Sequence, residues 1–278
     1  MRLRVQSYSE ISSWKNKALP FLRKEEGWNN LFWQIIDTKE KTSCRRWAGN
    51  VFEQGEVFLS ALHTPSNYLL LSHGSSNAVH TMSKYSLDKK WELAGLCGPE
   101  TVVNSYLEYQ GKKGPQSPCS SQRVFKLFQT YSHNENPRFE DYKLVPVSKI
   151  DWPKARIWAQ QFAMEADPPM NISAITQLAK QMYSTHNLFV LTDPQNHPCA
   201  MAGFGRSTER YRVINMVYVP TQMRRQGIGR ELVTRMVVHA KELGYHSCLL
   251  FSEWLEVGNL YDAMGCKLLG TFVEYELV

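Results

Sequence analysis

The sequence predicts a mixed α/β protein, with helices packed on a mixed sheet. Apolar runs of strand length alternate with amphipathic stretches of helix length along the whole chain, which is long enough to bury a core. At 278 residues the length favours two domains, or one large one, and residues 111–121 interrupt the pattern with Gly, Pro, Ser and Lys. We therefore place one α/β domain at residues 1–120 and another at 121–278, with a second candidate break at 134–141.

Helical spacing and capping residues locate the elements of the first domain. Bulky side chains recur at helical spacing over residues 28–36, Ser75 or Ser76 can cap a later helix, and Pro99 suits the first turn of another. We expect, in order, a helix at 25–37, strands at 45–53, 57–63 and 68–73, a helix at 75–87, a strand at 91–98 and a helix at 99–110. The aromatic residues expected in packing rather than in a ligand site are Trp28, Phe32, Trp33, Trp47 and Phe58.

The second domain shows the same signals more clearly. Asn171 is a candidate helix cap, the turn at residues 193–196 favours a hairpin, and Gly244 is placed to end a long helix. We expect strands at 124–131 and 142–147, helices at 152–166 and 171–186, strands at 187–193, 199–207 and 211–220, a loop and helix at 223–244, a strand at 246–252, a short helix at 258–265 and a final strand or hairpin at 266–277.

Composition and charge exclude several classes of protein. The chain is 43% hydrophobic and 21% charged, which argues against intrinsic disorder. No apolar run approaches the about 18–20 residues that span a bilayer, and the first residues lack the apolar core of a secretory signal. The net charge of +6 comes without a block of five like charges. It fits a solvated basic surface or a site for an anionic ligand, and we expect no nucleic-acid or membrane partner.

The cysteines indicate a reducing compartment. They are scattered along the chain with no CxxC pair and no Cys/His pair at zinc-ligand spacing, so we expect free thiols, no metal and a cytoplasmic location. Three of them lie in apolar runs and are expected in the core. Those three are Cys97, Cys248 and Cys266.

The most informative stretch is VYVPTQMRRQGIGREL, at residues 217–232. A strand ends at Pro220, and a loop with two glycines spaced G-x-G leads into a helix. Glycines allow close approach of the backbone and unusual φ angles, and the free amides at a helix start favour an anion such as phosphate. The amides that would face the anion belong to Gln226, Gly227, Ile228, Gly229 and Arg230. The side chains that could add positive charge are those of Arg224, Arg225 and Arg230.

Taken alone, the two glycines would also fit a plain glycine-rich turn. The loop is not a Walker motif, because no Gly-Lys-Ser/Thr follows, and Leu232 occupies the third glycine position of the dinucleotide fingerprint.

At this point the sequence resembles the GNAT superfamily of acyl-CoA-dependent N-acyltransferases. Its central motif, Q/R-x-x-G-x-G/A at a helix start behind a strand, stands here as Arg224-Arg225-Gln226-Gly227-Ile228-Gly229 behind Val217-Tyr218-Val219-Pro220. A second landmark, a Tyr ahead of Gly-Phe on a short helix, stands here as Tyr261-Asp262-Ala263-Met264-Gly265-Cys266, with Cys266 in place of Phe. The resemblance covers roughly residues 140–278.

The resemblance implies roles for these residues with acetyl-CoA as the co-substrate. The main chain of Val217, Tyr218 and Val219 would bond the pantetheine arm where the strand splays from its neighbour, and the loop amides would hold the pyrophosphate. Tyr261, with an ordinary phenol pKa near 10, would protonate the departing thiolate. Asn259 lies near a CoA-contacting Asn of the family, although its spacing to Tyr261 is one residue short.

A general base is harder to assign. The acceptor amine must lose a proton, and Glu209 and Glu253 are the candidates. Glu253 follows a buried strand at the point where the cleft should open, and we take it as the candidate base. Each carboxylate also fits an ordinary solvated surface acid.

The first half repeats the element order of a GNAT core but not its motif. The helix after residues 68–73 begins SHGSSNAVHT, with one glycine and no arginine. The whole chain thus resembles acetyltransferases with a degenerate GNAT-like N-terminal half, the alternative being an unrelated α/β domain.

The resemblance implies an acetyl-CoA-dependent N-acetyltransferase in which a primary amine attacks the thioester directly. The acceptor could be a small molecule or a peptide. A non-catalytic CoA- or acyl-CoA-binding regulator is the main alternative. An aminoacyl-tRNA-dependent transferase fits less well, because such an enzyme needs no intact CoA-binding loop.

Overall fold

The computed structural model describes residues 3–37, 47–64, 66–111, 117–127, 137–256 and 258–277. These residues form two compact units, Met1–Val124 with Leu269–Val278, and Phe125–Leu268. The boundaries between these units along the chain fall within two strands, β6 (Ser120–Leu127) and β12 (Lys267–Glu276). Cys44, residues 112–116 of the expected linker and residues 128–136 lie outside the described part.

The first unit is a mixed sheet with helices, and its strands follow the order β1-β2-β3-β4-β5-β12. All neighbouring strands are antiparallel except β4 and β5, which are parallel. Its elements are β1 (Arg4–Tyr8), α1 (Ile11–Leu22), the 3-10 turn η1 (Arg23–Glu25), α2 (Asn30–Asp37), β2 (Ala48–Glu53), β3 (Glu56–His63), β4 (Tyr68–Leu71), α3 (Ser76–Asp88), β5 (Gly95–Pro99) and α4 (Glu100–Tyr109).

The N-terminal end of this unit differs most from the sequence prediction. The sequence did not predict β1 or α1, and α1 contains Pro20, which breaks an interior helical pattern. The helix expected at 25–37 begins only at Asn30. The backbone turns first, because the amides of Trp28 and Asn29 bond the carbonyl of Glu25 at 3.1 and 3.0 Å. Phe32 and Trp33 are buried, as their expected packing role requires.

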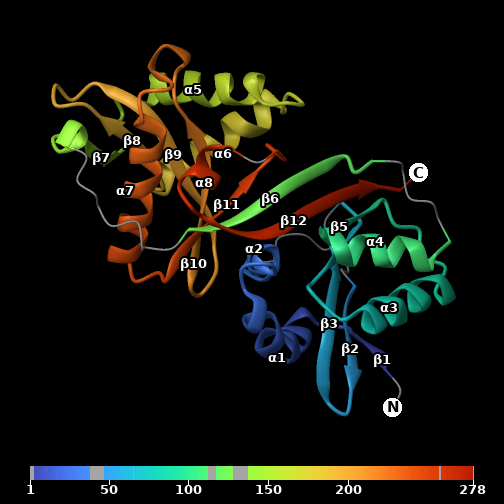
Figure 1. Cartoon of the computed structure of the whole chain (residues 1–278). Coiled ribbons are helices and arrows are strands. Elements are labelled where there is room, and N and C mark those ends of the chain that lie inside the picture. Colours follow the sequence, from blue (N-terminus) through green and yellow to red (C-terminus); the bar gives the residue numbers. More distant parts are fainter. Residues whose placement is uncertain are drawn as a thin grey trace. The chain divides into compact units, whose positions relative to one another are not determined.

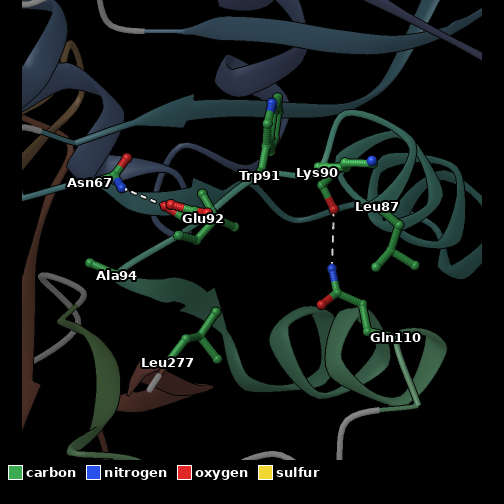
Figure 2. A pocket seen from close by; sticks show the side chains of 10 residues that line it. Asn67, Leu87, Lys90, Trp91, Glu92, Ala94, Gln110 and Leu277 are labelled. Atoms are coloured by element: carbon green, nitrogen blue, oxygen red, sulfur yellow. Dashed lines mark hydrogen bonds between the residues drawn. The ribbon is translucent and has the colours of Figure 1, made fainter.

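The first unit also contains a cavity of about 480 Å³ at the start of β5 and the C-terminal ends of α3 and α4 (Figure 2). The Trp91 indole forms part of its wall. Two amide side chains at its edge are already bonded, Asn67 to the Glu92 carbonyl at 2.8 Å and Gln110 to the Ser86 hydroxyl at 3.1 Å.

The second unit has the strand order β6-β11-β10-β9-β8-β7. Its antiparallel pairs are β7–β8, β8–β9 and β9–β10, and β10 and β11 are parallel. Its elements are the 3-10 turn η2 (Pro137–Phe139), β7 (Lys143–Pro146), α5 (Trp152–Glu165), α6 (Ile172–Ser184), β8 (Leu188–Thr192), β9 (Pro198–Ser207), β10 (Tyr211–Tyr218), the 3-10 turn η3 (Thr221–Met223), α7 (Ile228–Glu242), β11 (Ser247–Ser252) and α8 (Leu260–Ala263).

Two apolar layers cover the opposite faces of this sheet. One set of alternate strand residues packs under α7, and the other set packs under α5 and α6 (Figure 1). Leu191 and Ile214 illustrate the first layer, and Val190 and Met201 the second. All four are almost fully buried.

The local signals predicted for this unit are confirmed. Asn171 caps α6, its Oδ1 accepting the Ala174 amide at 2.9 Å. The Asp193 carboxylate accepts the amides of Gln195 and His197 at 2.9 and 2.7 Å and closes the β8–β9 hairpin. Gly244 has φ +89 just after α7, and residues 267–276 form one strand rather than a hairpin. Within the described residues, no helix has the length and apolar character to cross a membrane.

Candidate active site

The central feature of the second unit is the separation of strands β10 and β11. The parallel pairing of β10 with β11 runs from Tyr211↔Ser247 to Ile214↔Leu250 and stops there, although both strands continue. Just beyond, β10 slips in register against β9, and Met216 has φ +51. The predicted splay is therefore confirmed, and the main chain of Val217 to Val219 borders the opening.

The glycine loop turns the chain from the end of β10 into α7. Gly227 is the N-cap with φ +85, a left-handed conformation that favours glycine. The first helical bond runs from the Glu231 amide to the Gly227 carbonyl at 3.1 Å. Among the described residues, the amides of Ile228, Gly229 and Arg230 therefore donate to no protein acceptor, which suits a phosphate group.

Gly229 lets three elements approach one another. A Cβ atom there would lie 3.4 Å from Leu260 on α8 and 3.5 Å from Val219 after β10. The start of α7, the end of β10 and the short helix α8 thus meet at one point. This meeting places the two sequence landmarks, the glycine loop and the helix that carries Tyr261, in one site.

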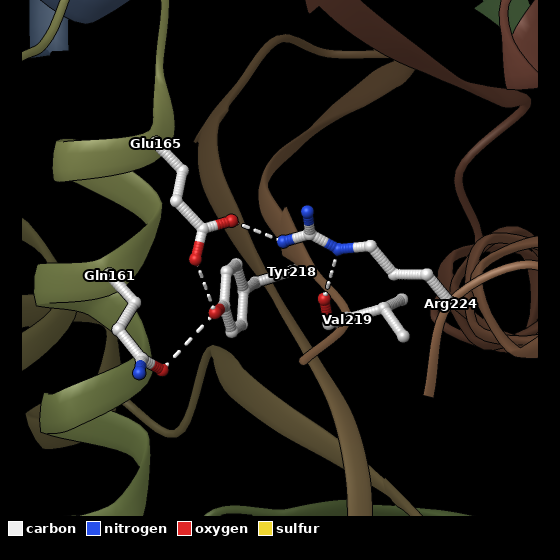
Figure 3. Close-up of polar contacts among 5 residues, drawn as sticks. All are labelled: Gln161, Glu165, Tyr218, Val219 and Arg224. Carbon is white, nitrogen blue, oxygen red and sulfur yellow. Dashed lines mark hydrogen bonds and ion pairs between the residues drawn. The ribbon is translucent and has the colours of Figure 1, made fainter. Parts of the chain in front are cut away.

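The three arginines of the loop have different surroundings. Arg224 turns back to form an ion pair with Glu165, and its Nε donates to the Val219 carbonyl at 2.8 Å (Figure 3). The Arg230 guanidinium donates to the Ala263 carbonyl at 3.0 Å, which ties α8 to α7. Arg225 has a backbone φ of +62, and its side chain is exposed. Gln226 accepts a bond from Arg138 at 3.2 Å.

A polar cluster at the end of α5 escaped the sequence analysis. The Tyr218 hydroxyl lies 2.9 Å from Glu165 Oε1 and 3.1 Å from Gln161 Oε1, and the Arg224 guanidinium lies over the Tyr218 ring (Figure 3). Burial would raise the pKa of Glu165, but hydrogen bonds from Arg224 and Tyr218 outweigh it and hold that pKa below its ordinary value. Burial also raises the pKa of Tyr218, and the neighbouring Glu165 carboxylate raises it further.

Asn259 and Tyr261 form one small structural unit. Asn259 Oδ1 accepts the amides of Tyr261 and Asp262, each at 2.9 Å, and so caps α8. Within the described part of the chain, its buried Nδ2 has no partner. The Tyr261 ring packs against Phe125, 5.5 Å between centroids. Burial raises the pKa of Tyr261, so the assumption of an ordinary phenol was wrong: the core beside Phe125 disfavours the phenolate.

The two candidate bases lie at opposite ends of the parallel pair β10–β11. Glu253 directly follows β11, at the side where β10 and β11 part, and is half-buried; it already has an interaction partner. Exposed Trp254 and Leu255 come next in the chain. Glu209 is exposed in the turn before β10, at the end of the strand opposite the opening. Among the described residues, no group of His, Cys, Asp or Glu could hold a metal ion.

Comparison with known proteins agrees with this geometry. The sequence profile of the Acetyltransferase (GNAT) family matches residues 151–262. No curated protein matches the chain significantly.

Solved structures extend the likeness to both units. A GNAT-family acetyltransferase from Colwellia psychrerythraea superposes with TM-score 0.60 at 13% identity, covering 99% of this chain and 100% of its own. A GCN5-related N-acetyltransferase from Sphaerobacter thermophilus gives 0.60 at 12%, covering 99% and 95%. A tandem GNAT protein from the clavulanic acid biosynthesis pathway gives 0.52 at 10%, covering 99% and 98%.

At these identities the likeness concerns the fold, and it confirms the predicted mixed α/β class with a GNAT fold in the C-terminal half and a GNAT-like N-terminal half. Residues 151–262 therefore match the GNAT family, and the chain as a whole has the fold of GNAT proteins.

Proposed function

We propose that this protein is an N-acetyltransferase that moves an acetyl group from acetyl-CoA to a primary amine by direct attack on the thioester. The observation that carries the proposal is the parting of β10 from β11 beside the unpaired amides at the start of α7. An open strand edge suits an extended pantetheine chain, and the amides suit a pyrophosphate. The GNAT domain at residues 151–262 supports the same assignment.

In this proposal the chain binds the co-substrate mostly through its backbone. The main chain of Val217, Tyr218 and Val219 bonds the pantetheine arm, and the amides of the loop hold the pyrophosphate. The exposed side chain of Arg225 adds positive charge beside the loop. Arg224 and Arg230 must first release Glu165 and Ala263 to reach a phosphate. Acetyl-CoA supplies the activated acetyl thioester.

The proposed proton transfers use Tyr261 and Glu253. Tyr261 lies on α8 beside the opening, and its raised pKa keeps it protonated at neutral pH and able to donate to a departing thiolate. Glu253, half-buried at the end of β11, is the proposed base for the amine. Asn259 acts by capping the helix that holds Tyr261.

One observation favours a second function. The burial that raises the pKa of Tyr261 also makes it a weaker acid than an ordinary phenol, so proton transfer to the thiolate is less favourable. A protein with an intact anion-binding loop but a weak general acid would bind acyl-CoA without turnover, as a regulator does.

Two measurements separate these functions. Calorimetry with acetyl-CoA should show one binding site in either case, and absence of binding would contradict both. Incubation with acetyl-CoA and a panel of primary amines should yield acetylated amine only if the protein is an enzyme. The product should be followed by mass spectrometry, because Cys119 is exposed and would react with thiol dyes that report released CoA.

We further propose that the protein acts in the cytoplasm on a small-molecule or peptide amine, without nucleic acid as a partner. The thiols support a reducing compartment. The described cysteines are free: Cys97, Cys119, Cys199, Cys248 and Cys266.

A further inference from the structure

The guanidinium of Arg224 lies in a set of groups that together bind a cation. It forms an ion pair with the Glu165 carboxylate, donates to the Val219 carbonyl at 2.8 Å, and its Cζ lies 5.6 Å from the centre of the Tyr218 ring (Figure 3). A carboxylate, a carbonyl and an aromatic face are the three kinds of group that attract an ammonium ion. We call this set, Glu165, Tyr218 and Val219, the cation box.

The box is held in shape without Arg224. Glu165 Oε1 lies 2.9 Å from the Tyr218 hydroxyl, which in turn lies 3.1 Å from Gln161 on the same helix as Glu165. Tyr218 itself is 4% exposed and is packed beside Trp158. The carboxylate therefore keeps its orientation when the cation changes, and a neutral phenol donor leaves its negative charge in place.

The present cation can leave. The side chains of Arg224 and Glu165 are 42% and 37% exposed, so solvent reaches both. Arg224 belongs to the loop between β10 and Gly227, and a long flexible side chain there can turn toward either end of that loop. An anion on the loop amides would attract it away from Glu165.

The box also adjoins the place where acetyl transfer is proposed. Two of its members, Tyr218 and Val219, are the last residues of the parted strand edge. The Val219 side chain reaches the neighbourhood of Gly229, at the start of α7. A cation in the box would therefore sit beside the proposed path of the pantetheine arm.

On the premise of the proposed function, we propose that Glu165 receives the ammonium group of a cationic acceptor, in the place that the Arg224 guanidinium fills in this structure. The substrate class is then an amine that also carries a positive charge, or an amine that arrives protonated. Neutral or acidic acceptors would gain no binding affinity from the cation box.

Binding of amines to Arg224 and Glu165 variants tests this directly. The probes are n-butylamine, 1,4-diaminobutane and 2-phenylethylamine, each paired with the alcohol of the same shape. Arg224→Ala frees the box, so at least one amine should bind it by calorimetry about tenfold more tightly than it binds the wild type, while the alcohols should not. Adding Glu165→Gln should abolish that gain.

Steady-state kinetics supply a second readout. Glu165→Gln alone should raise KM for the preferred amine about tenfold without raising the acetyl-CoA Kd, because it leaves Arg224 free to turn toward the loop, and Glu165→Asp should restore part of the loss. Glu242→Gln, at the far end of α7, is the matched control and should change neither constant. Melting temperatures of all variants confirm folding.

The outcomes separate this inference from the proposed function. If acetyl-CoA binds but Glu165→Gln leaves amine binding unchanged, or if amine and alcohol bind Arg224→Ala equally, or if no probe binds it, the cation box is wrong. If acetyl-CoA does not bind, the proposed function fails, while charge-specific amine binding to Arg224→Ala would still support the box.

Discussion

A Cβ atom at Gly227 would lie 3.3 Å from Cε2 of Phe139, whose ring packs against the start of α7. Gly227 also has φ +85, so two constraints require glycine there. A left-handed conformation costs a residue with a Cβ about 1–2 kcal/mol. Gly227→Ala should lower the free energy of unfolding by about that amount, measured in urea.

Gly227→Asp should also abolish acetyl-CoA binding, because it places a carboxylate among the amides proposed for the pyrophosphate. Calorimetry measures this. Gly244 offers a matched control, since it has φ +89 and a Cβ atom there would have nothing within 4 Å. Gly244→Asp should share the loss of stability and keep the affinity, and normal acetyl-CoA affinity in Gly227→Asp would remove the pyrophosphate from this loop.

Tyr261→Phe should separate catalysis from binding. The phenol is proposed to donate a proton during thiolate departure, and loss of a general acid lowers turnover by about 10²-fold or more. The ring still packs on Phe125, so the acetyl-CoA Kd should not change. Tyr142→Phe removes a hydroxyl from a tyrosine packed against the same core and should leave turnover intact. Equal turnover in both variants would exclude Tyr261 from the chemistry.

Local patterns predicted much of the second unit, because its signals lie within a few residues of one another. The Asn171 cap, the hairpin turn at Asp193 and the stop at Gly244 each depend on neighbours in the chain. The glycine loop belongs to the same class, since residue type and φ requirement coincide at Gly227. In the first unit, by contrast, Pro20 inside α1 masked a real helix.

The features that escaped prediction depend on tertiary contacts. Arg224 was expected to serve a phosphate, but its nearest partner here is Glu165, 59 positions earlier in the chain. No periodicity relates such distant residues. The raised pKa of Tyr261 likewise follows from burial that only the packed core creates. The sequence therefore predicted the residues of the candidate site, and packing determined their partners and acidity.

Asn259→Ala should affect both stability and turnover. Its Oδ1 caps α8 through two amides, and loss of such a cap costs about 1 kcal/mol. Because α8 carries Tyr261, turnover should fall as well, and Asn259→Asp, which keeps the accepting oxygen, should retain most of both. Asn171→Ala removes the comparable cap of α6. It should cost similar stability in urea unfolding without changing turnover, and the same turnover in both alanine variants would contradict a role for the α8 cap.

His63 should make the stability of the protein depend on pH. Its ring packs against both Trp91 and Trp47, at 4.8 and 5.6 Å between centroids, and burial lowers its pKa below the ordinary 6.5. The folded protein thus resists a proton that the unfolded chain accepts. The stabilising contribution is complete above pH 6.5 and declines as the pH falls from 6.5 toward the lower folded pKa. Urea unfolding at pH 7.5 and 5.5, taken as about one unit on either side of that value, should show a smaller pH effect in His63→Phe than in the wild type, and equal pH effects would show that His63 is not responsible.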